Sequence, residues 1–310
     1  MLKRHFRELS VATALALVLI GLAIVAPAFF QPQPLLSLLT REAPTLVVAC
    51  GMALIIIARE IDISVGSQFA ICSVAAGLLA AKGVSLPLVF VASVALGGVM
   101  GALNGWLVAG LRLPSIVVTL ATMVTLRQGL NMARQGEFVN LPDGVQWFGL
   151  SQMTGQWTLV SAAFTLLVLM AFATKHLAAG RFVYAVGTDA EASRLAGIRP
   201  QMVTFSTFVL LGALTGLAAM MNIAQSPQVQ PASGAGLELK VIAAVVVGGV
   251  AISGGRGNLW GMFVGLLLLA CIAPALTHLH IEAYWEKAIQ GAIILLAVVA
   301  DGLRSRKLNR

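Results

Sequence analysis

The sequence MALIIIAREIDISVGS, residues 52–67, shows how this chain is divided into helices. A run of apolar and β-branched residues ends there at three charges, Arg59, Glu60 and Asp62, and a second apolar run follows at once. Charges and polar residues between two apolar runs mark the end of one helix and the start of the next. The pattern therefore predicts a helix break, with Asp62 or Ser64 available to cap the second helix.

A related break occurs once more along the chain, in VIAAVVVGGVAISGGR, residues 241–256. Three pairs match at an offset of 189 residues, namely Ile63 with Ile252, Ser64 with Ser253 and Gly66 with Gly255. After each break an amide-glycine pair recurs, Asn104-Gly105 and Gln290-Gly291. We interpret these matches as a parallel duplication, in which the first four helices are echoed by the last four, and we expect the Ile-Ser-x-Gly turn to be the shared element.

The composition excludes a soluble globular protein. Of the 310 residues, 59% are hydrophobic and only 10% are charged, with a mean hydropathy of +0.93, whereas soluble domains carry about 25% charged residues. The net charge of +8 is spread between apolar runs, which fits a membrane protein and argues against a nucleic-acid partner. Cys50, Cys72 and Cys271 lie in apolar segments, as small buried residues rather than disulfide partners.

The fold class we predict is an all-α integral membrane protein, with residues 1–310 forming a single transmembrane domain. Its first helix has a basic start typical of a secretory signal, but it is followed by segments just as apolar. Ten helices are expected, at about 10–30, 44–58, 64–81, 86–110, 114–133, 157–174, 201–223, 237–252, 259–277 and 287–302.

The orientation follows from the basic residues. With the N-terminus inside, the cytoplasmic side receives fourteen lysines and arginines and the outer side receives six. Both termini are then cytoplasmic. A long loop, 134–156, lies outside, and a second one, 175–200, lies inside.

The inner loop contains the pattern of a short capped helix over about 189–196. Thr188 and Glu191 fit a capping box, Gly197 suits the left-handed position after the last turn, and Pro200 ends the segment. A helix of two turns is marginal by itself in water. It is expected either to dock on a partner or to be a capped connector resting on its own protein.

The sequence offers no set of residues for catalysis or for metal binding. The glycine-rich stretch 245–261 lacks the lysine of a phosphate-binding loop, and G-x-x-x-x-G-K-[ST] occurs nowhere in the chain. The glycines fit close helix packing or a broken backbone that lines a cavity, and a tight structural turn is the alternative. The chain is therefore expected not to be an enzyme and to hold no cofactor.

Four motifs, in order along the chain, resemble one family: IDISVGS (61–67), GALNGWLVAGLRLPSIVVTLATM (101–123), GRFVYAVGTDAEASRLAGI (180–198) and LELKVIAAVVVGGVAISGGRGNLWG (237–261). They are similar to the signature stretches of bacterial ABC-importer permeases of the ribose, rhamnose and autoinducer-2 type. The resemblance spans residues 44–302.

This resemblance implies a permease in the bacterial inner membrane that moves a monosaccharide-like solute. It implies a second permease copy or paralogue, a pair of cytoplasmic ATPases that bind ATP and Mg²⁺, and a periplasmic substrate-binding protein, besides the surrounding lipid. The coupling segment would comprise Thr188, Asp189, Glu191, Ser193, Arg194 and Gly197. The translocation path or gate would comprise Asp62, Ser64, Gly66, Asn104, Thr119, Asn222, Ser253 and Gly255.

Arg59-Glu60 departs from the family, in which many members have two glycines there. It marks either one half of a heterodimeric pair or a substrate subgroup. Asp62 is expected to be a cap or hinge, with direct sugar contact as the alternative. Two rival functions remain: an ion-coupled secondary transporter that uses Asp62, and an ABC permease for branched-chain amino acids.

Overall fold

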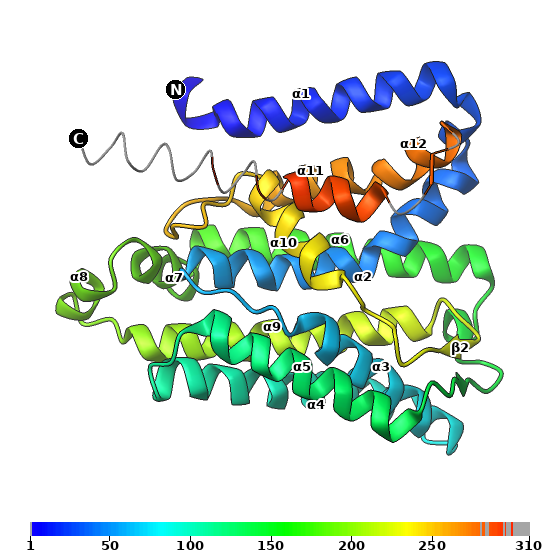
Figure 1. Ribbon diagram of the computed structural model, residues 1–310, viewed down its shortest axis with the longest axis horizontal. Helices are drawn as coiled ribbons and strands as arrows, with labels where there is room; N and C mark the ends of the chain where they lie inside the picture. Colours follow the sequence, from blue (N-terminus) through cyan, green and yellow to red (C-terminus); the bar gives the residue numbers. More distant parts are fainter. Residues whose placement is uncertain (1, 280, 283–284, 294, 296–298, 300–310) are drawn as a thin grey trace.

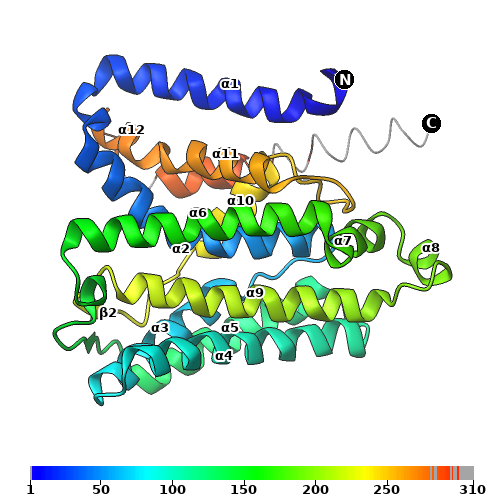
Figure 2. The same cartoon turned by 180° about the vertical axis from the view of Figure 1, so that it is seen from behind.

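The structure, a computed structural model, describes residues 2–279, 281–282, 285–293, 295 and 299. This part of the chain is mainly helical, and its long helices run along roughly one direction (Figures 1 and 2). In chain order the elements are α1 (Leu2–Val25), η1 (Pro27–Phe30), α2 (Pro32–Ile57), α3 (Val65–Ala81), α4 (Leu86–Gly105), η2 (Trp106–Gly110), α5 (Ser115–Arg134), β1 (Val139–Asn140), η3 (Gln146–Gly149), α6 (Gln152–His176), α7 (Ala178–Thr188), α8 (Ala190–Leu195), α9 (Pro200–Ile223), β2 (Gln228–Val229), α10 (Leu237–Val247), α11 (Leu259–Ala270) and α12 (Ile272–His278).

Most of the expected helices are present, with three corrections. The second helix begins at Pro32 rather than at residue 44, because Pro32 sits in the first turn, where a missing N–H is harmless. Pro44 lies inside α2 and does not end it; a proline is tolerated in a membrane helix whose neighbours satisfy the freed backbone groups. The inner loop 175–200 holds two helices, α7 and α8, instead of one.

The C-terminal part of the expected topology differs in detail. The segment 237–252 forms a helix only as far as Val247, and 259–277 is divided into α11 and α12. Residues 285–293 are helical. Most of the second half of the predicted helix 287–302 lies outside the described residues, as does the C-terminal stretch 303–310 with its four basic residues.

Six helices of the described chain are long and apolar enough to cross a membrane: α2, α4 extended by η2, α5, α6, α9 and α11 extended into α12. Residues 11–25 and α3 are shorter apolar helices. The protein is therefore a multi-pass helical membrane protein. The count of ten spans and the duplication stay predictions.

Helix α2 occupies the centre. It packs against α6, α9, α10 and α11, and 94% of its most apolar stretch is buried. Figures 1 and 2 show it between the layer of α9 and that of α10 and α11, with α1 outermost, next to α11. By contrast, only 17% to 28% is buried in the corresponding stretches of α4, α5 and α6. Large apolar side chains on them, such as Leu88, Leu120 and Phe172, are exposed, as on lipid-facing surfaces.

A ridge of small residues joins α4 to α9. Ser93, Gly97, Gly101 and Gly105 recur every fourth residue along one face of α4, so they form one stripe. A methyl group on Gly97 would collide with the carbonyl oxygen of Gly212. The Ser93 hydroxyl donates to the carbonyl oxygen of Gly216 at 2.8 Å. In lipid, where burial from water cannot drive association, such close backbone approach and hydrogen bonding hold helices together.

The molecule has two distinct ends. Helices α7 and α8 and the start of α1 lie at one end, and β2 lies at the other (Figure 1). At that second end the expected outer loop is tied down, because β1 pairs antiparallel with β2 and the Trp147 amide donates to the Ala224 carbonyl at 2.8 Å. Both helix breaks lie at the α7 end, because the Gly255 amide donates to the carbonyl oxygen of Ile57 at 2.8 Å.

Gly97→Ala is expected to lower the apparent melting temperature of the purified protein by several degrees, because overpacking a tight helix contact costs about 1–3 kcal/mol. Gly98→Ala is the matched control, since its added methyl group would approach only the Ala213 side chain, at 3.8 Å. The measurement is a thermal unfolding curve in detergent. Equal shifts for both variants would contradict the close contact between α4 and α9.

Candidate functional site

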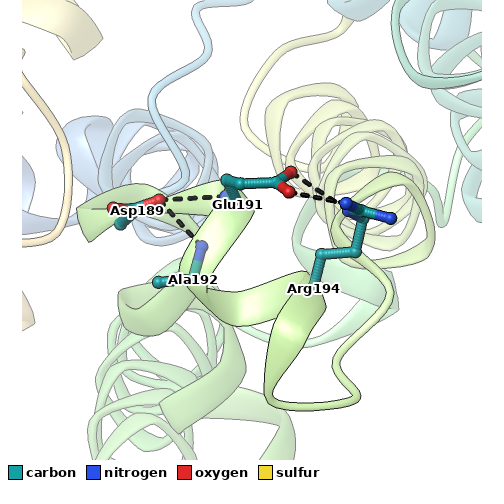
Figure 3. Close-up of polar contacts among 4 residues, drawn as sticks. All are labelled: Asp189, Glu191, Ala192 and Arg194. Carbon is teal, nitrogen blue, oxygen red and sulfur yellow. Dashed lines mark hydrogen bonds and ion pairs between the residues drawn. The ribbon is translucent and has the colours of Figure 1, made fainter.

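Helix α8 begins at a cap that differs from the predicted one. The Asp189 carboxylate accepts hydrogen bonds from the amides of Glu191 and Ala192, both at 2.9 Å (Figure 3). Thr188 is the last residue of α7, and its hydroxyl donates to the Tyr184 carbonyl. The predicted capping box of Thr188 and Glu191 is therefore wrong by one position, because α7 extends as far as Thr188 and leaves Asp189 as the first residue with extended backbone.

The C-terminal end of α8 follows the prediction closely. Gly197 has φ of +85°, the left-handed conformation that glycine adopts without strain. The Ile198 amide donates to the Ser193 carbonyl and the Gly197 amide to the Arg194 carbonyl, both at 3.0 Å. These two bonds form a Schellman motif, which ends the helix sharply. With both ends capped, α8 holds its shape although it spans only Ala190–Leu195.

The outward face of α8 is exposed. Leu195 is 78% exposed, and Glu191 and Arg194, which are also exposed, form an ion pair across one turn (Figure 3). Ser193 is buried, and its hydroxyl donates to the Asp189 carbonyl. The helix thus turns its small polar residue toward the protein and leaves an apolar side chain and two charges exposed.

Helix α7 connects α8 to both breaks through backbone contacts. A methyl group on Gly187 would collide with the carbonyl oxygen of Ile57, at the end of α2. One on Gly255 would collide with the Thr188 hydroxyl. The Tyr184 hydroxyl also donates to the Gly257 carbonyl at 2.9 Å. The end of α2, the loop before α11 and the end of α7 therefore form one tight three-way junction.

The two breaks differ in their backbone, which corrects the expected common turn. Gly255 has φ of +68°, whereas Gly66 lies in the first turn of α3 and is helical. In the first break the left-handed residue is Arg59, with φ of +77°. Arg59 contacts the loop of the second break, because a methyl group on Gly254 would lie 2.6 Å from its side chain. Identical residues at matching positions of the two stretches, such as Gly66 and Gly255, thus adopt different backbone conformations.

Asp62 is the centre of a buried hydrogen-bond cluster. One carboxylate oxygen accepts from the amide and hydroxyl of Ser64 at 2.8 and 2.6 Å, and the other accepts from Gln68 and Asn104, each at 3.3 Å. All four residues are 0% exposed. The predicted role of Asp62 as a cap fits its bond to the Ser64 amide, whereas the Ser64 side chain does not cap α3.

The cluster extends to α5 and fixes the break between helices. The Thr122 hydroxyl donates to Asn104 at 2.9 Å. The Ile63 amide donates to the Thr119 hydroxyl at 3.2 Å, and the Ile61 amide donates to Ser115 at 3.3 Å. The irregular backbone between α2 and α3 thus receives its hydrogen bonds from α5, as buried backbone requires.

The predicted path residues therefore separate into three groups. Asp62, Ser64, Asn104 and Thr119 belong to the closed cluster. Gly255 lies in the three-way junction, and Ser253 nearby is exposed. Gly66 packs against Gly234 and Glu238, and Asn222 alone lines a cavity at the other end. The sequence could not group them, because each group is assembled by different helices.

Polar cavities lie at both ends of the described part of the chain. One, of about 810 Å³, lies beside α8, and its charged lining residues are Arg59, Glu60, Arg112, Glu191 and Arg194. The other, of about 590 Å³, includes Arg41, Glu42, Asn222, Lys240, Lys287 and Gln290 in its lining. The basic residues assigned to the inner side and to the outer side thus line different cavities.

Glu42 is the main residue that the sequence analysis missed. It is 4% exposed, and its Oε1 accepts from the Lys240 ammonium at 2.7 Å. The sequence analysis predicts that the second helix begins at about residue 44, so Glu42 falls in the preceding loop. Two proline residues at 32 and 34, which allow an early helix start, were the available signal.

Gly187→Ala is expected to loosen the junction, lowering the apparent melting temperature of the protein, because the collision is with backbone that cannot swing away. Gly129→Ala, on α5, where nothing lies within 4 Å, is the control. Hydrogen exchange at the Gly255 amide should speed up in Gly187→Ala and not in the control. Unchanged exchange there would argue against the junction.

The hydrogen bonds from Arg194 hold the pKa of the Glu191 carboxyl below its ordinary value of 4.5. A lowered pKa means that the pair stabilises α8 fully above the ordinary value of 4.5, and that this contribution is lost as pH falls from there through the lowered pKa. In Arg194→Gln the pKa should rise toward 4.5. A ¹³C NMR titration of labelled glutamate measures this, and an identical midpoint in both proteins would contradict the pairing.

Known proteins similar to the chain are transport permeases. The model of the family described as branched-chain amino acid transport system / permease component matches residues 35–298. The autoinducer 2 import system permease protein of Enterobacter sp. (strain 638) is 33% identical over 305 residues, covering 98% of this chain and 89% of that protein. The ribose import permease protein of Escherichia coli (strain K12) is 32% identical over 309 residues, with 96% of each chain covered. No solved structure matches the chain.

These proteins are named as permeases of import systems, and they match nearly the whole chain. The apolar helices and the match to the family model agree with the resemblance drawn from the four sequence motifs. The chain therefore belongs to the family of branched-chain amino acid transport system / permease components.

Proposed function

We propose that the chain is the membrane-spanning subunit of an ABC importer for a monosaccharide-like solute in a bacterial inner membrane. The observation that carries this proposal is the exposed, doubly capped α8, joined through Gly187 to the breaks after α2 and before α11. A partner that displaces such a helix would also displace the helices that are joined to it and that would line the solute path. The ribose and autoinducer 2 import permeases supply the solute class.

In this proposal ATP and Mg²⁺ are bound by separate ATPase subunits, because the chain lacks a phosphate-binding loop. Closure of the ATPase pair would displace α8, which carries exposed Leu195 and the Glu191–Arg194 pair. The tight contact of Gly187 with Ile57 would transmit that displacement to α2. A second permease copy or paralogue would complete the path, and a periplasmic binding protein would deliver the solute.

The α8 end is assigned to the cytoplasm in this proposal, and the termini with it. The cavity beside α8 carries Arg59, Arg112 and Arg194, which agrees with the excess of basic residues on the inner side of membrane proteins. Ser253, Arg256 and α7 lie at the same end, since the loop they belong to contacts Ile57 and Gly187.

The two rival functions make different demands. Branched-chain amino acids are favoured as an alternative solute by the description of the family model. Ion coupling through Asp62 would require its carboxylate to exchange ions, and both of its oxygens accept hydrogen bonds from neighbouring side chains in a fully buried position. That arrangement suits a structural hinge better.

The test is uptake into proteoliposomes that contain the permease together with candidate ATPase and binding-protein partners that co-purify with it. Uptake of labelled ribose should require ATP and all three components. Uptake by the permease alone, driven by a proton gradient, would overturn the proposal in favour of ion coupling. Uptake of leucine instead of ribose would transfer the chain to the amino-acid alternative.

Leu195→Asn is expected to lower ATP-driven uptake about tenfold, because a leucine that docks in an apolar groove contributes about 1.5–3 kcal/mol. The affinity of the binding protein for its sugar should stay unchanged. Met132→Asn, on α5 and equally exposed at 78%, is the control. Normal uptake by Leu195→Asn would count against docking through α8.

A further inference from the structure

A second polar site lies far from α8, between α2, α9 and α10, in the cavity of about 590 Å³. Glu42 is fifteen positions before Ile57 on α2, which places it about 22 Å along the helix axis from the three-way junction. It is also ten positions after Pro32. The carboxylate therefore lies inside a helix long enough to span a membrane, on its N-terminal half, and ionisable groups in such helices are costly and usually functional.

The hydrogen bonding of Glu42 is incomplete. Its Oε1 accepts from Lys240 at 2.7 Å and lies 3.7 Å from the Arg41 guanidinium. Its Oε2 is buried and has no hydrogen-bond partner among the described residues. An unsatisfied buried carboxylate oxygen costs free energy that a bound donor would recover. The contacts with Lys240 and Arg41 balance the charge of Glu42, which lines the cavity, and they leave its Oε2 without a donor.

The rest of the lining indicates what kind of donor fits. Thr45, Asn222 and Gln290 carry hydroxyl and amide groups that both donate and accept hydrogen bonds, and Phe69 adds an apolar ring. The remaining charged groups of the lining have both signs: Arg41, Lys287 and Glu286. Hydroxyl groups of a sugar likewise donate and accept, and its C–H faces stack on aromatic rings. The volume falls in the range of small-molecule sites.

We propose that this cavity is a binding station for a neutral polyhydroxylated solute, in which Glu42 Oε2 accepts a hydrogen bond from a solute hydroxyl group. The proposal rests on the proposed import function and specifies where the permease holds its solute. The station is linked to the break: Phe69 in its wall neighbours Gln68 on α3, which donates to Asp62. The same turn of α3 therefore contacts both the cavity, through Phe69, and the hydrogen-bond cluster at the break, through Gln68.

The first experiment measures ribose uptake by the complete importer. Glu42→Gln keeps the size of the side chain and removes the charged acceptor, so uptake should fall about tenfold, as expected for the loss of one charged hydrogen bond. ATP hydrolysis stimulated by the loaded binding protein should persist. Glu137→Gln is the matched control, because Glu137 is an exposed carboxylate paired with Arg134 outside the cavity.

A double variant separates binding from folding. Glu42→Gln with Lys240→Gln removes both charges and leaves no unpaired ion, so its melting temperature should return toward that of the wild type. Its uptake should remain low, because the charged acceptor is still absent and the neutral amide oxygen that replaces it forms a weaker hydrogen bond. Recovery of both stability and uptake would overturn the proposal and leave the ion pair a structural role.

The second experiment detects binding directly in the permease alone. Asn222→Cys, with Cys50, Cys72 and Cys271 replaced by alanine, is labelled with a small polar thiol reagent in nanodiscs. Ribose, or rhamnose as a second probe, should slow the labelling, and Glu42→Gln should abolish this protection. Protection by leucine and not by the sugars would overturn the assignment to a polyol. Labelling that no sugar slows would overturn the binding station itself.

The two experiments distinguish the station from the function. If the wild-type importer takes up no sugar, the proposed function fails, whereas sugar protection of Asn222→Cys would still support the station. If the wild type imports ribose and Glu42→Gln imports it equally well, the station fails and the importer function stands.

Discussion

The structure depends on one close backbone contact, in which the Ile57 carbonyl receives the Gly255 amide while Gly187 presses against the same oxygen. Only a residue without a side chain fits at Gly187, since any Cβ would collide with that carbonyl. The contact brings together the end of the central helix, the loop before α11 and the helix that leads to α8. A movement of any one of these three segments must therefore move the others or break the contact.

The same constraint acts throughout the membrane-spanning part, because in lipid close packing and hydrogen bonding replace burial from water as the force between helices. The small-residue stripe of α4 lets its backbone approach that of α9, and the Ser93 hydroxyl adds a bond at 2.8 Å. The break after α2 is possible at all because Ser115 and Thr119 on α5 accept the amides of Ile61 and Ile63. The irregular backbone at this break thus forms its hydrogen bonds with a neighbouring helix.

Two polar regions are built on this frame, one at each end of α2. At the α8 end the charges are exposed and paired within one helix turn, as Glu191 and Arg194 are. Toward the other end Glu42 and Lys240 pair across 198 positions of sequence in a buried site. The Asp62 cluster lies at the break after α2. Its hydrogen bonds connect the backbone of that break to α3, α4 and α5. A central helix buried along 94% of its apolar stretch suits the transmission of a displacement between such regions.

Local features of the sequence are enough to predict the class of the protein, most helix positions and the end of α8, because apolar run length, charge placement and a glycine such as Gly197 act locally. It also located Asp62 and Asn104 as polar residues in apolar surroundings, without showing that they meet. Tertiary structure alone decided that Gly187 faces Ile57, that Arg59 and not Gly66 takes the left-handed conformation, and that Glu42 lies inside a helix beside Lys240. The reason is physical: these contacts join residues far apart in the chain, and only the packing of whole helices against one another brings them within bonding distance.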